Sequence, residues 1–157
     1  MTDKKIIYPK EFIKDVLIQE YGEIVPKHPY LAYALICSGI EMLGKCLNKS
    51  HTWESKSNDF IKCINKLFPE KYHRIEKELK DELRNGLLHS LRPKSKIKLD
   101  ELRKTNIFKN NHPHIYDNEI TLVIEYFYID FVEACKKVIE KDFPKESKMH
   151  KPFINIT

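Results

Sequence analysis

The residues best suited to chemistry in this chain lie in one short stretch, Arg84-Asn85-Gly86-Leu87-Leu88-His89. An arginine guanidinium can hold a phosphate through two parallel hydrogen bonds. Histidine is the side chain whose unperturbed pKa suits proton transfer near neutral pH. A phosphate clamp and a proton carrier, with no metal ligands nearby, are a minimal set for cleaving RNA. We therefore take Arg84, Asn85 and His89 as candidate catalytic residues.

The same stretch also admits a structural interpretation, because an arginine and a histidine five positions apart are common on helix surfaces. Asn85-Gly86, however, is a poor choice inside a helix and costs about 1 kcal/mol or more relative to better helix formers. Positions that violate local propensity are often functional or strained. The sequence therefore favours a function for this stretch without deciding it.

A long amphipathic helix over residues 70–91 is expected to carry these residues. Its core stripe consists of apolar residues four positions apart: Ile75, Leu79, Leu83, Leu87 and Leu91. At about 100° per residue, Arg84, Asn85, Leu88 and His89 fall on the opposite face. An apolar residue on a face away from the core indicates contact with another chain, so Leu88 is a candidate dimer-interface residue.

A basic segment, residues 92–109, begins three residues after His89. It holds seven basic residues and two acidic ones, an excess equal to the formal net charge of +5 of the whole chain. A basic strip beside a phosphate clamp is typical of a polyanion-binding surface, although many such strips are merely solvated. The candidate nucleic-acid-binding residues are Arg92, Lys94, Lys96, Lys98, Arg103 and Lys104.

The rest of the chain predicts a single all-α domain with its core at about residues 9–142 and a polar C-terminal tail at 144–157. Apolar residues at helical spacing, with proline and glycine at the ends, predict five helices: 9–21, 30–47, 58–68, 70–91 and 121–142. Helices joined mostly by short loops predict an antiparallel bundle. The pattern breaks between residues 93 and 118, which predicts a small irregular or β-hairpin-like excursion between the fourth and fifth helices.

The second of these helices is apolar nearly all round and is expected to be the central one. Gly39 and Gly44 lower its helix propensity and are best explained by the close approach of a neighbouring helix. Glu41 lies on the same helix, where an unpaired buried carboxylate is costly. It therefore either pairs with Arg84, as possible support for the site, or faces solvent.

Composition excludes several classes of protein. The four glycines among 157 residues are too far apart to form a phosphate-cradling loop, which excludes the P-loop and dinucleotide fingerprints. No apolar run approaches the ~20 residues that span a bilayer, so we expect no membrane partner. The first nine residues lack the apolar core of a signal peptide, which predicts a cytoplasmic location.

Metal and cofactor sites are not expected. The cysteines, Cys37, Cys46, Cys63 and Cys135, are scattered, whereas zinc ligands come in closely spaced pairs. Buried reduced thiols are the better interpretation. His112-Pro113-His114 lacks carboxylate or thiol neighbours and is interpreted as a polar loop.

The pattern Arg-Asn-x-x-x-His near the end of a long helix, here Arg84-Asn85 followed by His89, resembles the HEPN superfamily (higher eukaryotes and prokaryotes nucleotide-binding). The resemblance covers roughly residues 9–142. Many members are metal-independent endoribonucleases, often toxins or phage-defence effectors, that dimerise so that two motifs form one cleft. A homodimer, an RNA substrate and a cognate antitoxin or partner protein are thereby implied.

The resemblance also implies a role for each residue. His89 would take the ribose 2′-hydroxyl proton or protonate the leaving oxygen, Arg84 would stabilise the phosphorane-like transition state, and Asn85 would orient the phosphate or the imidazole. The products would carry a 2′,3′-cyclic phosphate and a 5′-hydroxyl. The alternative is a catalytically inactive helical dimer that acts as a protein- or nucleotide-binding module.

Overall fold

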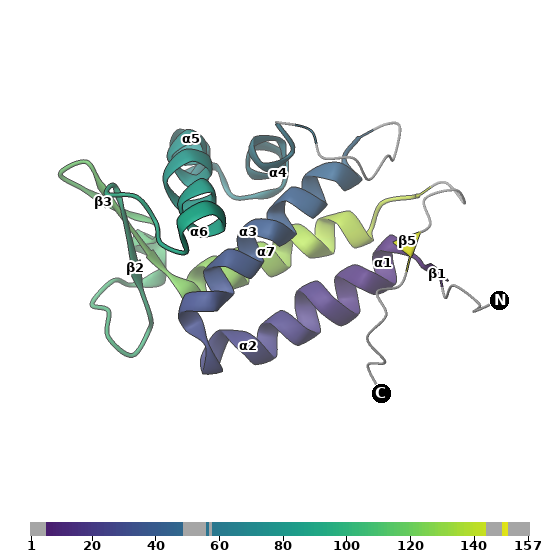
Figure 1. Cartoon of the computed structure of the whole chain (residues 1–157), viewed down its shortest axis with the longest axis horizontal. Helices are drawn as coiled ribbons and strands as arrows, with labels where there is room; N and C mark the ends of the chain where they lie inside the picture. The colour runs from purple at the N-terminus through teal and green to yellow at the C-terminus, as the bar shows by residue number, and fades with distance from the viewer. Residues whose placement is uncertain (1–5, 49–55, 57, 144–148, 151–157) are drawn as a thin grey trace.

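A computed structural model of the chain describes residues 6–48, 56, 58–143 and 149–150. The fold is mostly helical, with a small three-stranded sheet at one end (Figure 1). The elements are β1 (Ile6–Ile7), α1 (Pro9–Phe12), η1 (Ile13–Glu20), α2 (Tyr21–Lys27), α3 (Pro29–Cys46), α4 (Asp59–Leu67), η2 (Glu70–Ile75), α5 (Glu76–Glu78), η3 (Leu79–Arg84), α6 (Asn85–Ser90), β2 (Ile97–Asp100), η4 (Lys109–Asn111), β3 (His114–Tyr116), β4 (Glu119–Val123), α7 (Ile124–Ile139) and β5 (Met149–His150).

The long helix α3 crosses the face of the molecule nearest the viewer in Figure 1, and α7 lies behind it. It contacts α2, α4 and α7, which confirms its predicted central place. The predicted close approaches are present as well. A Cβ at Gly39 would lie 2.5 Å from the Phe131 ring of α7, and one at Gly44 would lie 2.0 Å from the Asp59 carbonyl oxygen of α4.

The first helical segment is longer than predicted, because it runs from α1 through the π-helical η1 and α2 to Lys27. Gly22 was expected to end it. Instead, Gly22 leaves room for the hydroxyl of Tyr128, which donates a hydrogen bond of 2.6 Å to the Ile18 carbonyl. A glycine that looks like a helix end in sequence here serves the packing of α7 on this segment.

The segment from Glu70 to Ser90 is also not one uniform helix, since it passes from 3-10 (η2) through α (α5) and π (η3) to α (α6). Four residues overshoot one α-helical turn by about 40°. The wider π turn of η3 offsets part of that drift. As a result Leu79, Leu83 and Leu87 are all fully buried, although they are four apart.

The excursion predicted between helices is a three-stranded sheet of order β2-β4-β3. Strands β3 and β4 form a hairpin whose two turn residues, Asp117 and Asn118, have φ of 46° and 63°, as expected for a tight two-residue turn. Strand β2 pairs with β4 in parallel. The predicted start of the last helix at Thr121 was wrong, because the β-branched residues of Glu119–Val123 form a strand and α7 begins at Ile124.

One face of this sheet packs on the helices. Ile97 and Leu99 of β2 lie beside Ile120 and Leu122 of β4, and all four belong to the hydrophobic core or pack against it. The sheet is therefore fixed to the helical body, next to the end of α6. Within the described residues, no helix combines the length and apolarity needed to cross a bilayer.

Candidate active site

Arg84 is the last residue of η3 and directly precedes α6. Its guanidinium is bound by Glu41, which projects from α3: Nε lies 3.2 Å from Oε2, and Nη2 lies 2.8 Å from Oε1 and 2.9 Å from Oε2. The predicted pairing of Glu41 with Arg84 is therefore present. The two side chains remain 21% and 24% exposed, so the pair is held in place and is still accessible from solvent.

Asn85 takes part in the same cluster. Its Oδ1 accepts a hydrogen bond of 2.7 Å from Nη1 of Arg84, so it orients the guanidinium in this structure. Arginine has five N–H donors. Among the described residues, Glu41 and Asn85 leave one N–H donor on Nη1 of Arg84 unused. A phosphate oxygen could accept a hydrogen bond from this donor.

His89 lies in the last turn of α6 and is exposed. Within the part of the chain that the structure describes, no group hydrogen-bonds to its imidazole. Both ring nitrogens are thus open to a ligand. Arg84 and His89 lie on consecutive helical elements, η3 and α6, and no hydrogen bond joins them.

Close packing explains why glycine stands at position 86 in spite of its poor helix propensity. A Cβ at this position would lie 2.6 Å from the Arg92 carbonyl oxygen and 2.9 Å from the Pro93 Cα. The chain thus folds back over α6 directly after the helix, and the Lys94 amide donates 2.9 Å to the Glu82 carbonyl. Only glycine leaves room for this return, which brings the start of the basic segment onto the helix that carries Arg84 and His89.

The helix ends at Ser90, one residue before its predicted end. Leu91 adopts a left-handed conformation with φ of 56°, and it is 73% exposed instead of lying in the core stripe as predicted. The Tyr30 hydroxyl of α3 donates to its carbonyl oxygen. Leu88 is 39% exposed. Together with Tyr30 and Leu31, which are about half exposed, these leucines give the surface near the motif an apolar component.

The six basic candidates are all exposed, but the structure divides them. Arg92 and Lys94 follow α6 directly, whereas Lys98 and Lys104 line an open polar cavity of about 350 Å³ on the outer face of the sheet. Lys104 also lies 3.1 Å from Glu101, and Arg103 lies 3.8 Å from it. The basic segment is therefore divided between cations that follow α6 directly and cations on or after β2, at the polar cavity.

The interpretation of His112 as part of a polar loop was wrong, because its side chain is 1% exposed. Nδ1 lies 3.3 Å from the Tyr72 hydroxyl, and Nε2 accepts 3.0 Å from the Val123 amide. Tyr72 donates 2.7 Å to Asp130, which pairs with Lys71 at 2.9 Å. Burial, and secondarily Lys71, lowers the pKa of His112 to about 4. Sequence periodicity gave no signal for this cluster, since its members come from three distant segments.

The cysteines agree with the prediction. Cys37, Cys46, Cys63 and Cys135 are free and buried, and burial raises the pKa of each thiol. Burial is the main cause for Cys37: the charge of Arg84 lowers its pKa and that of Glu41 raises it, but the buried thiol stays protonated at neutral pH. The described residues contain no group of three or more histidine, cysteine, aspartate or glutamate side chains that could hold a metal ion.

Comparisons with protein-family models, with curated proteins and with solved structures gave no match to this chain. The functional interpretation therefore rests on the residues themselves and on the geometry of the Arg84 cluster.

Proposed function

We propose that the protein is a metal-independent endoribonuclease of the HEPN type, with Arg84 and His89 as its reacting groups. The observation that supports this most strongly is the Arg84 cluster. Glu41 and Asn85 fix the guanidinium from two sides and leave one Nη1 donor unused, and His89 lies exposed on α6, the helix that directly follows Arg84. Donors fixed in advance stabilise developing negative charge without reorganising during the reaction.

In the proposed reaction the ribose 2′-oxygen attacks the adjacent phosphorus and the bond to the 5′-oxygen breaks. His89 takes the 2′-hydroxyl proton, and the imidazole of a second protomer protonates the leaving 5′-oxygen. The unused Nη1 donor of Arg84 binds an equatorial oxygen of the transition state, and the guanidinium charge stabilises the others. Asn85 and Glu41 act as positioning residues for Arg84. The products carry a 2′,3′-cyclic phosphate and a 5′-hydroxyl.

A homodimer is part of this proposal, because a single protomer offers one imidazole for two proton transfers. Leu88 lies one residue from His89 and is 39% exposed, so an interface through this face would bring two copies of His89 together. The proposal places the protein in the cytoplasm, with RNA as substrate. The proposal also includes a cognate antitoxin or other partner protein that covers the same face.

The alternative is a catalytically inactive binding module, in which the Glu41–Arg84 pair serves only to hold α6 on α3. The two are separated by incubating the purified protein with total RNA in EDTA, beside Arg84→Ala and His89→Ala variants. The proposal expects cleavage with cyclic phosphate ends that falls by about 100-fold or more in each variant. Cleavage that survives both substitutions, or no cleavage by the wild-type protein, favours the binding module.

A further inference from the structure

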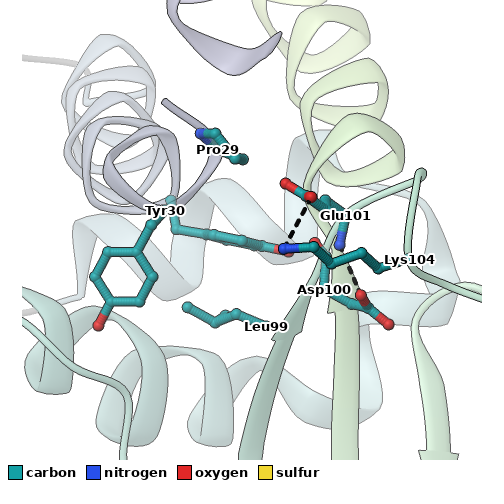
Figure 2. A pocket seen from close by; sticks show the side chains of 7 residues that line it. Pro29, Tyr30, Leu99, Asp100, Glu101 and Lys104 are labelled. Atoms are coloured by element: carbon teal, nitrogen blue, oxygen red, sulfur yellow. Dashed lines mark hydrogen bonds and ion pairs between the residues drawn. The ribbon is translucent and has the colours of Figure 1, made fainter. Parts of the chain in front are cut away.

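A second cavity, of about 200 Å³, lies between the start of α3 and the end of β2. Its lining residues are Pro29, Tyr30, Tyr33, Leu99, Asp100, Glu101 and Lys104. Figure 2 shows Tyr30 on one side and the Glu101–Lys104 pair on the other, with Pro29 above and Leu99 below. Pockets for drug-sized ligands measure about 300–1,000 Å³. This cavity therefore suits a smaller group, such as one planar ring system.

The Glu101 carboxylate is the unusual feature of this cavity. Its side chain is 11% exposed, and among the described residues its cationic neighbours are Lys104 at 3.1 Å and Arg103 at 3.8 Å, both to Oε1. A carboxylate can accept about four hydrogen bonds. Burial with most of that capacity unused is costly unless a ligand supplies donors.

Of the two tyrosines that line the cavity, Tyr33 is 1% exposed, so only the ring of Tyr30 is open to a ligand. The Tyr33 hydroxyl is already satisfied, since it lies 2.9 Å from the Asp100 carbonyl oxygen and 2.6 Å from that of Leu122. Tyr30 is 47% exposed, and its hydroxyl is directed to Leu91 and not into the cavity. RNA-binding proteins hold unpaired bases by stacking on such rings and by hydrogen bonds to their Watson–Crick edges.

We propose that this cavity binds a guanine base. Guanine carries two adjacent donors, N1–H and the N2 amino group, which match the two oxygens of the Glu101 carboxylate. Its O6 acceptor lies beside N1, where the Lys104 ammonium reaches it. Adenine, cytosine and uracil each present a single donor group on this edge, so none of them can engage both carboxylate oxygens in this way.

The cavity is linked to the motif, because Tyr30 forms its wall and bonds to Leu91, two residues after His89. Guanine bound here as part of an RNA strand would select the site of cleavage, an extension that rests on the proposed function. Guanine bound as a free nucleotide would not require it. The experiment therefore has one arm for each source.

In the first arm the full chain is titrated with GMP, IMP and AMP, and binding is followed by NMR at the Glu101 and Leu102 amides. In the second arm an eight-nucleotide uridine strand with one guanosine, inosine or adenosine is bound to the His89→Ala protein, so that cleavage cannot consume it. In each arm in which guanine binds, we expect its affinity to exceed that of hypoxanthine and that of adenine by about ten-fold.

Glu101→Gln should abolish this preference, whereas Glu133→Gln, an exposed glutamate of α7 away from the cavity, should preserve it. Tyr30→Ala should weaken binding of all bases and leave the preference unchanged. Discrimination in the strand alone assigns the site to RNA, and discrimination with GMP extends it to free nucleotides. Absence of discrimination in both arms, or discrimination that survives Glu101→Gln, overturns the inference. Failure of metal-independent cleavage with the GMP preference intact overturns only the proposed function.

Discussion

His89 and His112 occupy opposite settings within the same chain. His112 is buried, both of its ring nitrogens have partners, and its network ends in the Lys71–Asp130 ion pair. His89 is exposed at the end of a helix, and no described residue hydrogen-bonds to it. A histidine whose hydrogen-bonding capacity is used up inside the protein stabilises the fold. One whose capacity is unused beside a fixed arginine is available to a ligand.

The hydrogen-bond networks around His112 and around Arg84 show the same contrast. The His112 network joins η2, strand β4 and α7, and both ring nitrogens of His112 have partners within it. The Arg84 cluster joins α3, η3 and α6, and among the described residues it leaves one Nη1 donor of Arg84 without an acceptor. We therefore expect substitutions in the first network to change stability, and those in the second to change activity.

The largest expected effect separates the two histidines directly. His89→Ala should lower RNA cleavage by about 10²- to 10⁴-fold, the usual contribution of a general acid or base, with little change in the unfolding midpoint. His112→Ala should lower the free energy of unfolding by about 1–3 kcal/mol, because the Val123 amide loses its acceptor. Its cleavage rate, measured below the unfolding transition, should stay near the wild-type value. Reversed effects would refute the contrast.

The two histidines also show what the sequence could predict. His89 was identifiable because its neighbours in the chain, Arg84 and Asn85, carry the complementary chemistry. The Glu41–Arg84 pair was within reach because a carboxylate on an apolar helix needs a partner. His112 was missed because its partners, Tyr72 and Val123, lie 40 and 11 residues away and no local pattern joins them.

The fold divides in the same way. Helices were predictable from local periodicity, and helical segments do cover the five predicted regions at their centres. Strand β4 was mistaken for the start of α7, because its identity depends on pairing with Ile97–Asp100, more than twenty residues earlier. The helix ends predicted at Gly22 and Leu91 were wrong for a similar reason, since distant parts of the chain determine the structure there. Tyr128 packs on Gly22, and the returning chain follows Leu91.

The next effect is the pH dependence of the buried histidine. Its pKa is lowered from 6.5 to about 4 in the folded protein, so the unfolded chain binds the proton more readily. Stability from this group is complete above pH 6.5 and is lost as the pH falls toward 4. We expect a loss of about 2 kcal/mol at pH 5 relative to pH 7.5.

Urea unfolding at both pH values tests this expectation when wild type is compared with His112→Phe. The variant cannot titrate at this position, so the wild type should lose more stability than the variant over the same interval. Groups elsewhere in the chain titrate equally in both proteins and cancel in the difference. Equal losses would show that His112 is not held neutral by the fold.

A smaller effect concerns the apolar surface beside His89. Light scattering should give about twice the 18.7 kDa mass of one chain, and Leu88→Asp should shift the protein toward the monomer because a buried carboxylate at an interface is costly. Ile129→Asp is a matched control, since Ile129 is also on a helix and is 40% exposed against 39% for Leu88. A dimer that persists in Leu88→Asp would place the interface elsewhere.

The smallest effect tests whether the exposed cations contact phosphate. Each phosphate contact adds about 0.7 to the slope of log affinity against log salt for single strands. Replacing both Lys96 and Lys98 with glutamine should therefore flatten the slope for RNA binding by about one unit or more. Thermal stability should hardly change, because exposed charges contribute little to it.

The matched control for this variant replaces Lys66 and Lys77, which are exposed on the helical body, and so removes the same net charge away from the sheet. A general loss of positive charge would flatten both slopes equally. Contacts made by the basic segment would flatten only the Lys96 and Lys98 slope, because the counterions released on binding are those of the phosphates actually neutralised. Binding measured at three salt concentrations for the three proteins distinguishes these outcomes. An unchanged slope in the Lys96 and Lys98 variant would show that these lysines do not contact phosphate. It would contradict the proposed nucleic-acid surface beside the motif.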